Sequence, residues 1–314
     1  MSDVRLFKLT DSAADELQGQ TVLLESELQS LMETHLEVFL GVRFLASEYS
    51  TGKTHRGRID SLGIDENNCP VIIEYKRSSD ENVINQGLFY LDWLMDHQAE
   101  FKLLVQEKIG PDASDEIDWS NPRLVCIARD FTKYDEHAVQ QINRNIELLR
   151  YRWYHEGYLI LELVTAATGT SPSNSIGNSH STGGTPTSGA SQLPANRKSA
   201  SDYLTQASPE LQNLYRELEA QCVSLGDDVQ QKTLKYYVAF KRIKNFACVE
   251  VHPQSERLLV YLKVDPTTVE IEPDFTRDVT NIGHFGTGEL EVSITSLEDL
   301  RRSEELFRTS YENS

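Results

Sequence analysis

Two short segments decide the fold: Arg58–Asp65, with the sequence Arg-Ile-Asp-Ser-Leu-Gly-Ile-Asp, and Pro70–Arg77, with the sequence Pro-Val-Ile-Ile-Glu-Tyr-Lys-Arg. Both are rich in apolar and β-branched residues, and the turn between them is polar, which predicts a tight antiparallel hairpin. Side chains alternate faces along a strand, so Glu74 and Lys76 share one face. The hairpin therefore brings the Asp60 and Glu74 carboxylates to one edge of a sheet.

Two carboxylates and a lysine at one sheet edge predict hydrolysis of a phosphodiester bond. Hard oxygen ligands that leave several waters in place suit magnesium, which bridges carboxylates to phosphate oxygens. The metal would polarise the phosphate and lower the pKa of a bound water, and Lys76 would position that water or offset charge in the transition state. An exposed Glu-Lys pair is the alternative, and Glu-x-Lys alone favours it. Asp60 and the helix that follows reverse this preference.

That helix is predicted directly after the second strand. Ser78-Ser79-Asp80-Glu81 is a helix N-terminus signal. Apolar residues then recur at helical spacing: Val83, Ile84, Leu88, Leu91 and Leu94. Gln86 and Tyr90 stand one turn apart on the same helix face. If the helix packs beside the strand ends, Gln86 reaches the site, although an ordinary polar stripe has the same spacing.

These motifs carry a resemblance to the PD-(D/E)XK nuclease superfamily: Asp60, Glu74-Tyr75-Lys76 and Gln86-x-x-x-Tyr90. With Gly57-Arg58-Ile59-Asp60, they most resemble the branch of archaeal and actinobacterial mismatch or single-strand-specific endonucleases. Ile59 stands where the superfamily's name has proline. The resemblance covers roughly Glu25 to Val164 and implies an α/β domain with a restriction-endonuclease-like mixed sheet flanked by helices.

The resemblance also implies roles for individual residues. Asp60 and Glu74 would hold Mg²⁺ or Mn²⁺, Lys76 would act on the water, and Gln86 would orient the site. An acidic residue from an upstream helix would complete or support the metal shell. Our choice for that residue is Glu27, and its rivals are Glu25, Glu33, Glu37 and Glu48.

Overall charge argues against a nucleic-acid enzyme, because the chain carries a net charge of −19 and phosphate contacts need lysine and arginine. Positive charge nevertheless clusters beside the predicted site. The run Lys53-Thr54-His55-Arg56-Gly57-Arg58 leads into Asp60, and Arg77 follows Lys76. A solvated loop would have the same composition. The candidate nucleic-acid contacts are Arg56, Arg58, Arg77 and Tyr90.

The length of 314 residues leaves room for two domains. We assign residues 1–165 to the nuclease-like domain and 202–314 to a smaller α+β accessory domain. Residues 166–201 contain no acidic residue and are dominated by Ser, Thr, Gly, Asn and Pro, which predicts a flexible linker. The accessory domain resembles a bacterial domain of unknown function that is often labelled as transport-related.

Apolar spacing predicts further elements. In the first domain we expect a strand at 4–8, helices at 23–40, 99–108 and 135–150, and strands beginning at 42 and at 124–128 and 157–163. Residues 110–121 are expected to form a loop. In the second domain we expect a helix at 204–223, strands at 233–241, 247–251, 258–264 and 290–294, and a closing helix at 296–310.

Four scattered cysteines without a Cys-x-x-Cys pair fit a reducing cytoplasm, and no signal segment or membrane-length apolar run is present. We therefore expect a cytoplasmic, metal-dependent nuclease that acts on DNA, with no membrane partner. Cutting both strands of a duplex would need a homodimer. The alternatives are a catalytically silent nuclease fold used for binding or sensing, for example in phage or mobile-element defence, and a protein-interaction adaptor.

Overall fold

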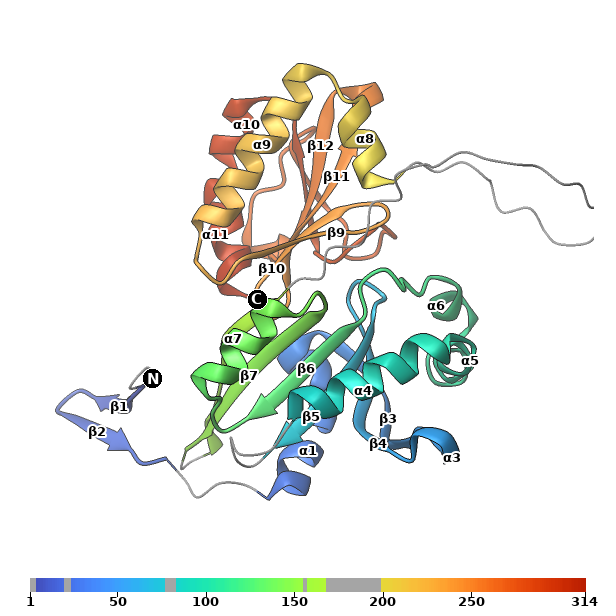
Figure 1. Ribbon diagram of the computed structural model, residues 1–314. Helices are drawn as coiled ribbons and strands as arrows, with labels where there is room; N and C mark the ends of the chain where they lie inside the picture. Colours follow the sequence, from blue (N-terminus) through green and yellow to red (C-terminus); the bar gives the residue numbers. More distant parts are fainter. Residues whose placement is uncertain (1–3, 20–23, 77–82, 155–156, 168–198) are drawn as a thin grey trace, which may run out of the picture. The chain divides into compact units, whose positions relative to one another are not determined.

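The computed structural model describes residues 4–19, 24–76, 83–154, 157–167 and 199–314. Within these ranges the chain divides into two compact units, each built on its own six-stranded sheet (Figure 1). The exact domain boundaries stay predictions, because most of the predicted linker lies outside the described residues. The ends of the linker predicted at 166–201 differ from the structure. The last strand of the first unit extends to Ala167, and the first helix of the second unit begins at Ala200.

The sheet of the N-terminal unit is mixed. Its strands are β3 (Val42–Ser50), β4 (Arg58–Asp65), β5 (Pro70–Lys76), β6 (Arg123–Ala128), β7 (Asn145–Trp153) and β8 (Leu159–Ala167), and they lie side by side in that order. The first three strands pair antiparallel, β5, β6 and β7 pair parallel, and β8 returns antiparallel. The predicted hairpin is therefore confirmed as the β4–β5 pair.

Helices cover both faces of this sheet (Figure 1). On one face, α1 (Glu25–Thr34) and α2 (Leu36–Leu40) pack against β5, β6 and β7. On the other face lie α4 (Val83–Asp96), α5 (Gln98–Lys108) and α7 (Lys133–Gln141). The short helices α3 (Gly52–His55) and α6 (Pro111–Asp115) and the hairpin of β1 (Leu6–Thr10) and β2 (Ala13–Leu17) complete the unit. The predicted mixed sheet flanked by helices is confirmed.

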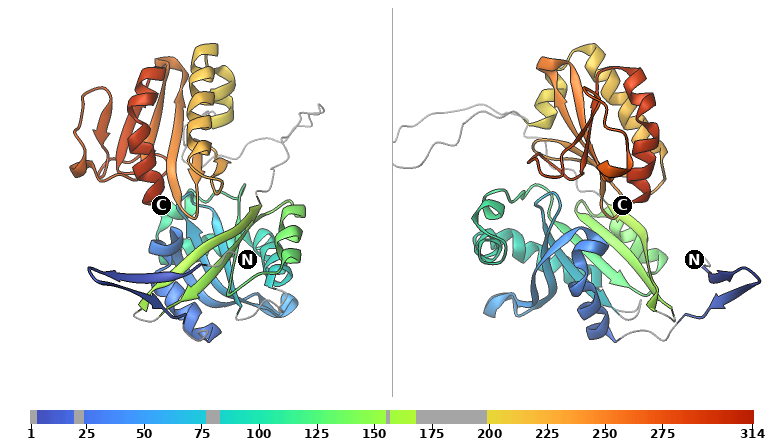
Figure 2. Two further views of the ribbon diagram at one scale, coloured as in Figure 1. Left: turned by 90° about the vertical axis from the view of Figure 1, so that its left-hand side faces the viewer. Right: turned by 180° about the vertical axis from the view of Figure 1, so that it is seen from behind.

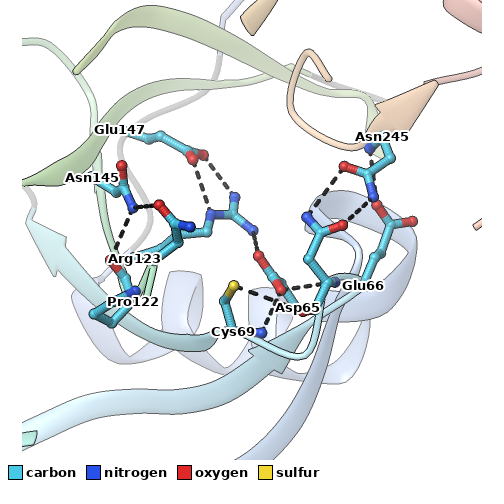
Figure 3. Close-up of polar contacts among 10 residues, drawn as sticks. Asp65, Glu66, Cys69, Pro122, Arg123, Asn145, Glu147 and Asn245 are labelled. Carbon is cyan, nitrogen blue, oxygen red and sulfur yellow. Dashed lines mark hydrogen bonds and ion pairs between the residues drawn. The ribbon is translucent and has the colours of Figure 1, made fainter. Parts of the chain in front are cut away.

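Buried charges fix the turn between β4 and β5. One oxygen of Asp65 accepts hydrogen bonds from the backbone of Asn67 and Cys69, both 2.9 Å, and the other accepts from Arg123 at 2.9 Å. Arg123 also makes a two-pronged contact with Glu147, at 2.9 and 2.8 Å (Figure 3). All three charged side chains are buried. The hairpin is thus tied at its turn end to β6 and β7, which leaves its open end as the place where β4 and β5 separate.

Several predicted elements of the N-terminal unit differ from the structure. The helix predicted at 135–150 ends at Gln141, and its second half is strand β7. The helix predicted at 23–40 breaks at His35 into α1 and α2. The loop predicted at 110–121 contains α6, and the strand β2 was not predicted.

The C-terminal unit is α+β, as predicted. Its sheet has the order β13-β14-β12-β11-β10-β9, and its helices gather on one face (Figure 2). The strands are β9 (Gln230–Thr233), β10 (Val238–Lys241), β11 (Asn245–His252), β12 (Arg257–Leu262), β13 (Thr276–Asp278) and β14 (Leu290–Ile294). The helices are α8 (Ala200–Gln206), α9 (Pro209–Ser224), α10 (Leu297–Arg302) and α11 (Glu304–Glu312), with short 3₁₀ turns at Pro253–Ser255 and Pro266–Thr268. The predicted strand at 233–241 is in fact the β9–β10 hairpin, and β13 was not predicted.

Among the described residues, none of the helices combines the length and the apolar character that crossing a bilayer requires.

Candidate active site

Asp60 and Glu74 lie side by side where β4 and β5 separate. The β4–β5 ladder ends at the pair Ser61 and Ile73. Beyond it, the backbone N–H of Asp60 donates to Glu74 Oε1 at 3.2 Å, and the N–H of Tyr75 donates to Asp60 Oδ2 at 3.0 Å. Each carboxylate therefore bonds to the backbone of the other strand. This exchange holds the two side chains together without using their second oxygens.

Glu74 is fully buried, with 0% of its surface exposed, and its Oε2 has no hydrogen-bond partner among the described residues. The pKa of Glu74 is raised to about 9, mainly by burial and secondly by the charge of Asp60. Burial is also the largest cause of the raised pKa of Asp60, and the nearby carboxylates of Glu25 and Glu48 add to it. Two such groups are stable as anions only when a cation compensates them.

Lys76 lies at the end of the same strand and is nearly buried. It shares a sheet face with Glu74, as predicted, whereas Tyr75 packs into the core of the opposite face. Its Nζ donates to Glu25 Oε1 on α1 at 3.1 Å. The Lys76 charge acts to lower the pKa of both Asp60 and Glu74. Lys76 and Glu25 therefore belong to the same cluster as the two carboxylates.

The position of Glu25 changes our choice of upstream acidic residue. Glu27 is exposed, and its Oε2 accepts a hydrogen bond from the backbone of Leu24 at 2.8 Å. This contact caps the first turn of α1. Glu25, one of the predicted rivals, is the α1 carboxylate that reaches the cluster.

Gln29 is a residue that the sequence analysis missed. It is buried on α1, and its Nε2 donates to the Asp60 carbonyl at 2.8 Å and to Ser47 Oγ at 3.1 Å. It also donates to Glu33 at 3.0 Å, which in turn accepts from Ser61 Oγ at 2.6 Å. Gln29 thus fixes the backbone that carries Asp60. The only sign of this role in the sequence is that the polar Gln29 directly follows Leu28, a buried residue of α1.

Gln86 and Tyr90 share one face of α4, as predicted, but they serve the backbone beside the cluster. The Tyr90 hydroxyl accepts hydrogen bonds from Gln86 Nε2 and from the backbone N–H of Arg58, both 3.2 Å. Tyr90 is buried, and a Cβ added at Gly57 would lie 2.4 Å from its ring. Tyr90 therefore positions the start of β4, and its contact with nucleic acid stays a prediction.

The predicted basic contacts are partly in place. Arg56 and Arg58 are exposed at the start of β4, whereas Arg77 lies outside the described residues. Arg58 forms an ion pair through its Nε with Glu48 on β3. Glu48 has a φ of +53°, a left-handed conformation that non-glycine residues rarely adopt within a strand. The positive charge beside the cluster is therefore exposed, but half of it is engaged by a neighbouring carboxylate.

The cluster offers the oxygen ligands that a divalent cation prefers, but too few of them to complete its coordination shell. Carboxylate oxygens are the preferred ligands of Mg²⁺ and Mn²⁺, and the unpartnered Oε2 of Glu74 offers one beside Asp60. In the part of the chain that the structure describes, no three His, Cys, Asp or Glu side chains are grouped closely enough to hold a metal. Asp60 and Glu74 would thus supply two ligands, and water or a further group the rest.

A pocket of 340 Å³ in the N-terminal unit has none of the cluster residues in its walls. Its walls include Lys53, His55, Trp93, His97 and Glu100, from α3, the second half of α4 and the first turn of α5. Trp93 and His97 stack on each other with ring centroids 4.7 Å apart. The buried carboxylates, rather than this hollow, carry the unusual chemistry of the unit.

Comparison with other proteins gives partial likenesses. Residues 200–314 match the sequence profile of a domain of unknown function, DUF5655, which confirms the predicted domain of unknown function and leaves its transport label a prediction. An uncharacterized protein of Haemophilus influenzae is 25% identical over 299 residues, which cover 95% of this chain and 96% of the relative. The similarity therefore spans both units.

Two solved structures resemble part of the chain. A repair endonuclease from Pyrococcus abyssi is 18% identical with a TM-score of 0.28, and the match covers 42% of this chain. An EndoMS–dsDNA complex is also 18% identical, with a TM-score of 0.24 and 44% coverage. In both cases the match spans 50% of the solved chain. At these TM-scores the likeness carries no argument about function, and the resemblance to a particular endonuclease branch stays a prediction.

Proposed function

We propose that this protein is a metal-dependent nuclease that hydrolyses phosphodiester bonds in DNA. One observation supports it above the others: the Glu74 carboxylate is fully buried, leaves Oε2 without a partner among the described residues, and lies beside a second carboxylate, Asp60. Ordinary cores do not retain such a pair, because each buried anion carries a large desolvation cost. A site that binds a cation removes that cost.

In this proposal the chain's own residues hold and orient the reactants. Asp60 and Glu74 would hold Mg²⁺ or Mn²⁺, which when bound supplies positive charge to the phosphate and lowers the pKa of a water. Lys76 would position the attacking water or offset charge in the transition state, and Glu25 holds its ammonium in place. Gln29 keeps the Asp60 backbone fixed. Gln86 acts through Tyr90 on the strand that carries Arg58.

A cleavage assay with two variants tests the proposal. Asp60→Asn and Lys76→Ala, incubated with Mg²⁺ or Mn²⁺ and single-stranded, duplex and branched oligonucleotides, should lose cleavage by at least about 100-fold. Glu37→Gln on α2 is the matched control, because it removes an exposed carboxylate. Circular dichroism should show the same fold in all three. Cleavage near the wild-type rate in either site variant would refute the assignment of the active site.

A second candidate is a catalytically silent nuclease fold that binds or senses nucleic acid. It is favoured by the lack of three grouped metal ligands in the described ranges. This candidate predicts binding of oligonucleotides without cleavage, and equal binding with and without Mn²⁺. A metal-dependent product in the assay above excludes it.

A further inference from the structure

The ion pair between Glu48 and Arg58 lies directly beside Asp60. Arg58 and Asp60 are two residues apart on β4 and so share a face. Glu48 is on β3, opposite Asp60, between two paired positions of the β3–β4 ladder. Arg58 Nε contacts Glu48 Oε2, and the Glu48 carboxylate is near enough to act on the pKa of Asp60. A carboxylate next to the proposed metal ligands is thus held by a cation that faces solvent.

This ion pair is easily exchanged. The side chains of Arg58 and Glu48 are 69% and 39% exposed, and ion pairs at such exposure contribute little to stability. A guanidinium also binds phosphate well, through two parallel hydrogen bonds. A phosphate group of a nucleic acid backbone can therefore compete for Arg58 against Glu48.

We propose that this exchange couples binding of the nucleic acid backbone to binding of the divalent cation. The inference rests on the proposed function. A backbone phosphate takes Arg58, and the released Glu48 carboxylate joins Asp60 and Glu74 as a third oxygen ligand. The unpartnered Oε2 of the fully buried Glu74 points to a cation at this place independently of Glu48.

The proposal accounts for the incomplete metal shell. Without substrate, the described residues group no three metal-ligating side chains, and Glu25 is engaged by Lys76. With substrate, the third ligand arrives from β3. The protein would then hold its metal weakly until a backbone phosphate is in place. Because coupling between two ligands is reciprocal, the metal must also tighten the binding of nucleic acid by the same factor.

Calorimetric titration with MnCl₂ tests this coupling. The full-length protein is titrated alone and with a short phosphorothioate oligonucleotide, as a single strand and as a duplex in separate runs. We expect the oligonucleotide to tighten Mn²⁺ binding about tenfold, within the range typical of coupled sites. In Glu48→Gln the tightening should fall to less than about twofold.

A double-mutant cycle separates this exchange from a general charge effect. Arg58→Met should tighten Mn²⁺ binding to the free protein, because Glu48 is released. If the effect passes through Glu48, it should vanish in the Glu48→Gln background. Arg56→Ala is the matched control: Arg56 is a nearby exposed arginine whose Nε donates to the Lys53 carbonyl. Arg56→Ala should weaken oligonucleotide binding and leave the coupling factor unchanged.

The outcomes separate this inference from the proposed function. Wild-type protein that binds Mn²⁺ and cleaves DNA, but shows the same coupling in Glu48→Gln, would overturn the exchange and leave the nuclease assignment standing. If Arg58→Met still tightens Mn²⁺ binding in the Glu48→Gln background, the exchange is overturned as well. Wild-type protein that neither binds Mn²⁺ nor cleaves would overturn both.

Discussion

Glu74 combines burial, a neighbouring like charge and an oxygen without a partner. In a metal-free protein this combination keeps the carboxyl protonated at neutral pH, because ionisation would place two adjacent anions at the fork of β4 and β5. A bound cation favours the ionised carboxylate over the protonated carboxyl, because its positive charge stabilises the anion. Stability and metal binding should therefore both depend on pH through this one group.

The pH dependence of stability follows from the sign of the shift. The pKa of Glu74 is about 9 in the folded protein and near its ordinary value of 4.5 when unfolded. Between these values the folded state binds the extra proton, so stability without metal falls as pH rises, by at most about 1.4 kcal/mol per pH unit from this group. Glu74→Gln removes the ionisation. In EDTA, the free energy of unfolding measured with urea should rise for the variant relative to the wild type from about pH 6 to about pH 8. A difference that is constant with pH would contradict this.

Glu25 and Glu27 make a matched pair, because both lie in the first turn of α1 and only Glu25 reaches Lys76. Glu25→Gln should lower the cleavage rate by about 10- to 100-fold, as expected for a group that orients a reacting side chain. Glu27→Gln should keep the cleavage rate and lose only part of the helix cap. Steady-state rates and thermal midpoints of the two variants check this, and equal loss of activity in both would restore the original choice of Glu27.

The β4–β5 hairpin is the element on which the candidate site depends. It is tied at its turn through Asp65 to Arg123 and Glu147, and it opens at the other end onto Asp60 and Glu74. Two further elements fix the open end: α1 through Gln29 and α4 through Tyr90. The site is thus assembled from one hairpin and two helices, which makes its geometry sensitive to the packing of the unit.

Removing the charge of Arg123 should destabilise the protein strongly. Arg123→Met leaves the buried carboxylates of Asp65 and Glu147 without a partner, which typically costs about 3–5 kcal/mol. Lys102→Met is the control, because its ion pair with Asp115 is exposed and its loss should be far smaller. Chemical unfolding of both variants measures the difference. Similar stabilities for the two would show that the buried triad does not hold the hairpin.

Elements with a simple local pattern could be predicted from the sequence, and those that depend on partners could not. The β-branched run before Glu74 identified β5. In contrast, Val139, Ile142, Ile146 and Leu149 follow a helical spacing, yet Ile146 and Leu149 belong to β7, because pairing with β6 and β8 overrides the local pattern. Pairing of Asp60 with Glu74 followed from the hairpin, whereas the contact of Gln29 with Asp60 depends on how α1 packs and has no local signal.

The whole chain is acidic, with a net charge of −19, so the proposed nucleic acid binding would rely on local charge. The exposed arginines at the start of β4 are the candidates in the N-terminal unit. The C-terminal unit matches a domain of unknown function. The binding assay described next uses the full-length protein, so that this unit is present.

Salt dependence should report how few phosphates the protein contacts. Each neutralised phosphate contributes a slope of about −0.9 to the plot of log affinity against log salt for duplex DNA. Two arginines predict a slope near −2, and Arg56→Ala should reduce its magnitude by about 1. Fluorescence anisotropy over a range of NaCl concentrations gives this slope. Absence of binding at every salt concentration would favour the adaptor over the nuclease.

The proposed divalent cation between Asp60 and Glu74 can be measured by calorimetric titration of MnCl₂ into wild type and Asp60→Asn, in two buffers that differ in ionisation enthalpy. We expect Mn²⁺ to bind the wild type with release of about one proton near neutral pH, because Glu74 must lose its proton, and to bind the variant at least about tenfold more weakly. No binding to the wild type, or equal affinity in both proteins, would contradict it.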